Sequence, residues 1–198
     1  GMVTTNDNEL WHRLWAFKDH GKSWDAVYNR EHPPGYRWLH ESFGTNWRMT
    51  EMQAAIGRVS LRKLSGWINA RRQNAAILDE HFSDIPILRV TIPSKDFFHT
   101  YWRYFCYLEE DKIKAGWSRE RIMNEMQQRG IEGHCGYGGE IYQEKAFDDT
   151  NWRPNERLPI AKELAESSLL FFVHPTLTEK QMRAKGSIAC SVLLEATK

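Results

Sequence analysis

The chain has 198 residues, a length that fits one domain or a small domain joined to part of another. Its 27 Lys and Arg residues and 26 Asp and Glu residues give a formal net charge of +1. A balance this even provides no overall field that would attract nucleic acid or an anionic membrane, so we expect neither as a partner. Three widely separated cysteines exclude a disulfide framework and CxxC metal spacing and favour a reducing cytoplasm, and no apolar run reaches the ~18–20 residues that span a bilayer.

The first predicted helix follows a short β-type run, MVTT, at residues 2–5. Asn6 is its expected N-cap, with Glu9 three residues later, and the pair His20–Gly21 is expected to end it. Residues 22–49 show no periodicity and are rich in Trp, Tyr and His. A connector of that length within a compact domain usually carries function or an interface.

A long helix is predicted to begin at Thr50, which forms a capping-box pattern with Gln53. If it continues unbroken to Phe82 it is about 50 Å long, which suggests a spine joining two domains. Gly57 and Gly66 inside it predict a bend or close packing. Its expected apolar positions are Met52, Ile56, Val59, Leu61, Leu64, Ile68, Leu78 and Phe82.

Shorter elements with a different periodicity follow this helix. Strands are expected at 87–92, 99–110, 131–137 and 169–174, and helices at 118–130, 158–168 and 178–196. A second capping box, Thr178 with Gln181, marks the start of the last helix. This order predicts an α/β layer in which helices cover a small, mostly antiparallel or mixed sheet.

Two histidines of this region are weak candidates for chemistry. His134 and Cys135 are adjacent on an expected strand, so their side chains point to opposite faces and would not share a metal ion. A catalytic Cys135 would need a histidine nearby in space, and a strand end entering a glycine turn is the favoured interpretation. His174, followed by Pro175, is better interpreted as a strand terminator than as an acid or base. We therefore predict no metal site.

The segment GTNWRMT at 44–50 is the best candidate for a binding site. Asn46 lies just before a capped helix start, where free backbone N–H groups and the helix dipole favour a phosphate or carboxylate. Arg48 adds a guanidinium fork suited to the same anions. The alternative is an Asx-type turn with Arg48 in a surface ion pair. The residues alone favour that alternative and leave the anion site open.

A longer stretch around this segment resembles a known family. Residues 44–78, GTNWRMTEMQAAIGRVSLRKLSGWINARRQNAAIL, closely resemble the G-x-N-[YWF]-R-M-[ST]-E-x-Q-A-A-x-G-x-x-x-L-x-x-L pattern of the DegT/DnrJ/EryC1/StrS family, whose members are pyridoxal-phosphate (PLP) aminotransferases of nucleotide-linked keto-sugars. Residues 1–21, 130–147 and 157–179 are similar to further segments of that family. The resemblance implies the C-terminal part of a fold-type I PLP aminotransferase, with 1–49 from the large domain, 50–83 as a connecting helix and 84–198 as the small α/β domain.

The resemblance also implies roles for individual residues. Asn46 would hydrogen-bond the PLP phosphate in the active site of the partner subunit of a homodimer. Arg48 would help shape the same site and is expected to bind substrate. Tyr142 falls where many members carry a substrate-facing histidine, which makes it a second candidate for substrate binding and leaves the sugar contact open.

The family's catalytic lysine is the main departure from the pattern. It lies just upstream of a double glycine, and this chain begins at that glycine; Lys18 and Lys22, the nearest lysines, lie on or after the first helix. We therefore expect no catalytic residue among the 198, and a chain that is inactive alone. The intact protein would transfer an amino group, from glutamate, to a nucleotide-linked keto-sugar for surface polysaccharide. The alternative is a non-catalytic binding or assembly module that complements a homologous subunit. Both predict a homodimer or larger self-association.

Overall fold

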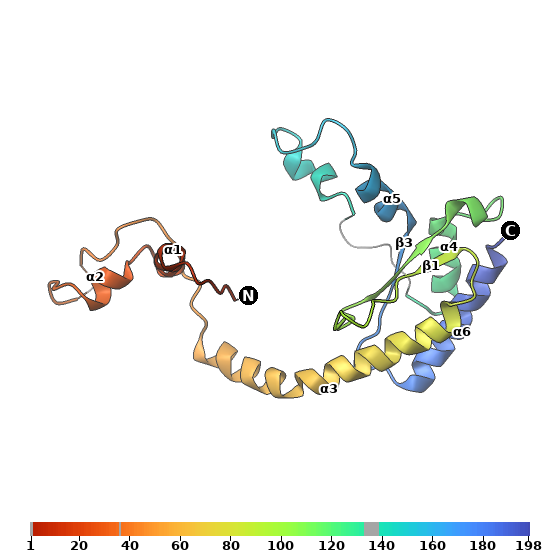
Figure 1. The fold of residues 1–198 in the computed structure, drawn as a ribbon, viewed down its shortest axis with the longest axis horizontal. Helices are drawn as coiled ribbons and strands as arrows, with labels where there is room; N and C mark the ends of the chain where they lie inside the picture. Colours follow the sequence, from red (N-terminus) through yellow and green to blue (C-terminus); the bar gives the residue numbers. More distant parts are fainter. Residues whose placement is uncertain (1, 36, 133–138) are drawn as a thin grey trace. The chain divides into compact units, whose positions relative to one another are not determined.

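The computed structural model describes residues 2–35, 37–132 and 139–198, and Figure 1 shows its helices and strands along the chain. The chain forms two compact units, one up to Arg62 and one from Lys63 onward. The predicted division at residues 49 and 83 stays a prediction. The helices are α1 (Asn8–Lys18), α2 (Trp24–Tyr28), α3 (Glu51–Phe82), α4 (Arg119–Gln128), α5 (Pro159–Ser167) and α6 (Glu179–Glu195), and the strands are β1 (Leu88–Val90), β2 (Tyr104–Leu108) and β3 (Ser168–Phe171).

The first unit begins with α1, whose N-cap differs from the prediction. Asp7, and not Asn6, has the extended backbone of a cap, and its carboxylate accepts a hydrogen bond from the Leu10 backbone N–H at 3.0 Å. The helix ends before His20 and Gly21, which have positive φ angles of 58° and 83°, as predicted. Residues 2–5 form no strand, since no described segment pairs with them.

Helix α3 begins with the predicted capping box. The Thr50 backbone N–H donates to Gln53 Oε1 at 2.9 Å, and the Gln53 backbone N–H donates to Thr50 Oγ1 at 3.3 Å. The helix runs unbroken to Phe82, and its buried residues lie only in the C-terminal third, from Asn74 onward. A Cβ added at Gly57 or Gly66 would meet no described atom within 4 Å, so the predicted close packing is absent from the described residues.

The second unit is built on a three-stranded antiparallel sheet in the order β1-β2-β3, which confirms the α/β prediction. Leu88 pairs with Leu108 and Tyr104 with Phe171. Strand β2 begins at Tyr104, later than predicted, and Tyr101 before it has a left-handed backbone with φ 46°. Residues 131 and 132 lie outside any strand, and 133–138 lie outside the described residues.

The core of this unit lies between the sheet and three helices. Helix α3 contributes Leu78 and Phe82, α4 contributes Ile122 and Met126, and α6 contributes residues from Met182 to Leu193. Helices α3 and α6 lie side by side in Figure 1. None of the described helices combines the length and the apolar character needed to cross a membrane.

Candidate functional site

The segment around Asn46 is held against the end of α1 by backbone hydrogen bonds. The Thr45 N–H donates to Phe17 O at 2.7 Å, the His20 N–H to Thr45 O at 2.9 Å and the Trp47 N–H to Lys18 O at 3.0 Å. Asp19 and Asn46 are therefore paired in an antiparallel bridge. This pairing fixes the backbone of the predicted anion site within one unit of the chain.

Two glycines permit this close approach. A Cβ at Gly44 would lie 2.4 Å from the Gly21 backbone nitrogen and 2.7 Å from Phe17 O. A Cβ at Gly21 would lie 1.6 Å from Ser42 O, and its positive φ is itself unfavourable for other residues. The glycines of the GTNW and HG motifs thus let two backbone segments meet, which explains why both turns are glycine-specific.

The side chain of Arg48 lies over this bridge and contacts several polar groups. Its Nε donates to Asn46 Oδ1 at 3.2 Å, and its Nη1 lies 3.4 Å from Asp19 Oδ1 in an ion pair. Its Nη2 lies 3.5 Å from His20 Nε2. The structure therefore brings Asn46 and Arg48 together, as the motif suggests, and adds two residues that sequence reasoning missed.

The Asp19 carboxylate is surrounded by positive charge. Its side chain is 13% exposed, Lys18 Nζ and Lys22 Nζ each lie 3.9 Å from one of its oxygens, and Arg48 provides the third cation. Asp19 Oδ1 is buried without a hydrogen bond among the described residues, so the ion pairs are what compensate its charge. With three cations around one carboxylate, the cluster keeps a net positive charge that favours an anion.

These groups fit the phosphate end of PLP, the cofactor that the resemblance implies. Asn46 uses its Oδ1 toward Arg48, and its Nδ2 has no acceptor among the described residues, which leaves two N–H donors for a ligand. Helix α3 begins five residues later, at Glu51. Lys18, the nearest lysine in sequence to the bridge, holds its Nζ over the Trp15 ring at 3.5 Å from the centroid and faces Asp19. The residues around the bridge are therefore better suited to binding an anion than to covalent attachment of an aldehyde.

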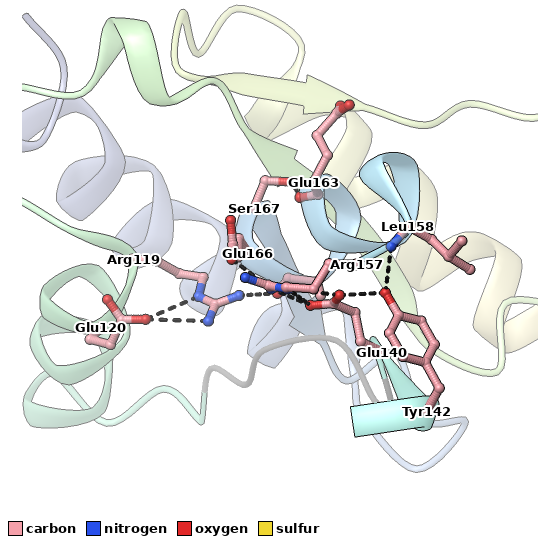
Figure 2. A network of polar contacts seen from close by, with 10 residues as sticks. Arg119, Glu120, Glu140, Tyr142, Arg157, Leu158, Glu163, Glu166 and Ser167 are labelled. Atoms are coloured by element: carbon pink, nitrogen blue, oxygen red, sulfur yellow. Dashed lines mark hydrogen bonds and ion pairs between the residues drawn. The ribbon is translucent and has the colours of Figure 1, made fainter. Parts of the chain in front are cut away.

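Tyr142, the other predicted site residue, belongs to the second unit and to a polar network shown in Figure 2. Its hydroxyl donates to Glu140 Oε1 at 2.5 Å and accepts the Leu158 backbone N–H at 2.8 Å. Arg157 pairs with the same Glu140 carboxylate and, at 2.8 Å, with Glu166. The Tyr142 hydroxyl thus ties the 3-10 turn Ile141–Gln143 to the start of α5.

The electrostatics of this network are dominated by the Glu140–Arg157 pair. Hydrogen bonds from Arg157 and then from Tyr142 lower the pKa of Glu140 from 4.5 to about 2. Burial, followed by the hydrogen bond to Glu140, raises the pKa of Tyr142. Both groups keep their ordinary charge at neutral pH, so the network acts as a fixed brace. No sequence signal identified Glu140 and Arg157 as partners, since they are 17 residues apart.

The remaining candidates carry no site in the described residues. His134 and Cys135 lie outside them. Strand β3 ends at Phe171, three residues before His174, whose Nδ1 lies 2.9 Å from Thr176 Oγ1 within a local turn. The described residues contain no group of three or more His, Cys, Asp or Glu side chains that could hold a metal ion.

Comparisons with known proteins agree on one family. Residues 1–185 match the model of the DegT/DnrJ/EryC1/StrS aminotransferase family. The chain is 32% identical over 132 residues to GDP-perosamine synthase of Escherichia coli O157:H7, covering 67% of this chain and 32% of that protein. It is 28% identical to dTDP-4-dehydro-2,3,6-trideoxy-D-glucose 4-aminotransferase of Saccharopolyspora spinosa, covering 92% of this chain and 45% of that protein.

A solved structure shows the same relation at the level of the fold. The crystal structure of an aminotransferase from Psychrobacter cryohalolentis is 45% identical, with a TM-score of 0.88, and the match covers 98% of this chain and 51% of that one. The predicted fold class is confirmed. The chain spans less than half the length of these two curated relatives and about half of the crystallised one.

Proposed function

The chain belongs to the DegT/DnrJ/EryC1/StrS aminotransferase family, and from that premise we propose that it supplies part of the active site of a PLP-dependent aminotransferase acting on a nucleotide-linked keto-sugar. The relatives that carry specific names support the substrate class, since GDP-perosamine synthase and a dTDP-sugar 4-aminotransferase are both among them. The proposal extends to amino-sugars for surface polysaccharide as products and to glutamate as the amino donor.

The arrangement around Asn46 is the observation that carries this proposal. The Asn46 amide presents N–H donors that have no acceptor within the described ranges, beside a cluster of net positive charge and at a backbone position fixed by the bridge to Asp19. Bound PLP supplies the electron sink for amino-group transfer. Within this proposal Asn46 binds and orients the phosphate group in the active site of a partner subunit. Direct substrate contacts by Arg48 and Tyr142 stay predictions.

The lysine that anchors the cofactor is proposed to lie outside these 198 residues. No lysine occupies the family's motif position, and Lys18 and Lys22 are both turned toward Asp19. Proton transfer at the reacting carbon, which needs that lysine amine, therefore does not belong to this chain in our proposal. In our proposal this chain binds the phosphate and completes the active site of the partner subunit.

Two measurements on the 198-residue chain test the proposal. Pyridoxamine 5'-phosphate, which has no aldehyde, should bind about ten- to a hundred-fold more tightly than pyridoxamine, because hydrogen bonds to a charged group contribute ~1.5–3 kcal/mol. Asn46→Ala should remove this preference. Incubation with PLP followed by borohydride should give no single stoichiometric pyridoxyl-lysine in the intact mass. Equal binding of the two amines, or one stoichiometric lysine adduct, would contradict the proposal.

A non-catalytic assembly module is the second candidate, and the apolar face of α3 favours it. Met52, Ile56 and Val59 share one face and are 42–76% exposed on a helix whose other end is buried in a core. Apolar area on this scale marks an interaction surface. The module would self-associate or pair with a homologous subunit to which it lends Asn46. Light scattering after size exclusion tests this, and a clean monomer at micromolar concentration would exclude self-association.

A further inference from the structure

The guanidinium of Arg48 is turned toward its own loop, which suggests a role other than direct anion binding. Nε contacts Asn46 Oδ1 at 3.2 Å and Nη1 contacts Asp19 Oδ1 at 3.4 Å. We propose that Arg48, anchored by Asp19, is a positioning residue that fixes the orientation of the Asn46 amide so that its N–H donors face the phosphate. The inference rests on the proposed function, because it needs Asn46 to be the phosphate contact.

The donor chemistry of arginine determines which way the amide faces. A guanidinium has only donors, so the atom of Asn46 that it contacts must be the amide oxygen. The amide nitrogen is bonded to the same carbon and therefore points away from Arg48. Without Arg48, the Asn46 side chain would sample other rotamers as well as both directions of its amide, and every orientation that offers an oxygen to the phosphate would repel it.

Asp19 gives the guanidinium a second point of attachment. Arg48 is about half exposed, whereas the Asp19 side chain is 13% exposed and its backbone is bridged to Asn46 itself. The carboxylate and the amide oxygen that Arg48 joins are thus carried by paired backbone positions. An exposed arginine with one contact would lose most of its benefit to side-chain entropy, and a second contact on a rigid bridge reduces that loss.

Charge alone makes a different prediction from positioning. If Arg48 only contributes positive potential, a lysine at the same position would serve equally. A lysine carries a single ammonium on a flexible stem and cannot bridge Asn46 and Asp19 with a planar fork. If Arg48 instead contacts the phosphate directly, its removal would weaken binding whether or not Asn46 is present.

The test uses the ratio of the dissociation constants of pyridoxamine and pyridoxamine 5'-phosphate, measured by calorimetry on the 198-residue chain. Arg48→Ala and Arg48→Lys should each lower this ratio about two- to ten-fold, since fixing one mobile side chain is worth ~0.5–1.5 kcal/mol in binding. In an Asn46→Ala background, Arg48→Ala should change the ratio no further. Arg30→Ala is the matched control, because Arg30 also pairs with carboxylates in this unit, at 2.9 Å from Asp25 and 2.5 Å from Glu41, and should leave the ratio unchanged.

A spectroscopic measurement detects the contacts of Arg48 with Asn46 and Asp19 without any ligand. The Arg48 Nε–Hε signal in a ¹⁵N correlation spectrum should be visible near neutral pH, where unbonded arginine protons exchange quickly, and should shift or vanish in Asn46→Ala and in Asp19→Asn. Backbone signals of the rest of the unit should stay in place, which separates this effect from unfolding.

The outcomes distinguish this inference from the proposed function. A wild-type chain without preference for the phosphorylated amine overturns both. If the preference exists and Asn46→Ala removes it, while Arg48→Ala keeps it or Arg48→Lys restores it, the positioning role is wrong and the proposed function stands. A loss on Arg48→Ala that persists in the Asn46→Ala background shows direct anion binding and also overturns the positioning role.

Discussion

Gly186 permits the close contact between α6 and α3, and its replacement by alanine should destabilise the second unit. A Cβ at this buried position would lie 2.4 Å from Cδ2 and 2.8 Å from Cγ of His81, distances that real Cβ atoms do not show. The partly buried imidazole ring would have to move away from α6. Overpacking of this kind costs ~1–3 kcal/mol.

Gly66 of α3 provides the matched comparison, because it is also a glycine inside a helix of the same unit and an added Cβ there meets no described atom within 4 Å. Replacing a helical glycine by alanine gains up to about 1 kcal/mol from backbone entropy. That gain is common to both variants. Gly66→Ala should therefore stabilise the chain. The free energy of unfolding of Gly186→Ala should be about 1–3 kcal/mol lower than that of Gly66→Ala.

Equilibrium urea unfolding, followed by circular dichroism, measures both free energies of unfolding on one scale. The double variant Gly186→Ala/His81→Ala identifies the clash: relative to His81→Ala alone, the added methyl group should now stabilise about as much as Gly66→Ala does. If Gly186→Ala is as stabilising as Gly66→Ala in the native background, the contact with His81 does not limit packing and the reasoning is refuted.

Three further predictions concern the second unit. Asn74→Ala should lower the free energy of unfolding by about 2 kcal/mol in urea, because the buried amide of Asn74 donates to backbone carbonyls at 173, 174 and 177; the exposed Asn69→Ala on the same helix should change it by less than about 0.5 kcal/mol. The Glu140 carboxyl should titrate near pH 2 by ¹³C NMR, and Arg157→Ala should return it toward 4.5. Its pKa is depressed on folding, so its contribution to stability is full above about pH 4.5 and is lost as the pH falls toward 2; a titration near 4.5 in the native chain would contradict the pairing. Cys106 is fully buried and burial raises the pKa of its thiol, so a disulfide reagent should modify it only after unfolding.

The elements that could be predicted from sequence are those specified by near neighbours. The capping boxes at Thr50 and Thr178 each join residues three positions apart, and both form as predicted. Helix α3 was predictable because its propensity and its start signal agree over 32 residues. The short helix α2 was missed, since five residues are too few to show a period.

The features that sequence reasoning missed depend on distant partners. Arg157 and Glu140 meet across 17 residues, and the predicted strand at 99–110 shortens to Tyr104–Leu108 because Arg71 and Arg72 hold the carbonyls of residues 99, 101 and 102 in a loop. The spacing of apolar residues does not predict which polar side chains will contact each other. The same holds for Gly186: that a side chain at this position would clash becomes clear only when the position of His81 is known.

The segment GTNWRMT shows how two interpretations that compete in sequence can describe one structure. Taken alone, it allowed either a surface turn with Arg48 in an ion pair or an anion site. The ion pair is present, since Arg48 contacts Asp19 at 3.4 Å, and the same guanidinium occupies the oxygen of Asn46. An amide whose oxygen is occupied by a donor can offer a ligand only its N–H groups. Under the positioning proposal, the ion pair is therefore what makes Asn46 selective for an anion, and the choice between the two interpretations disappears.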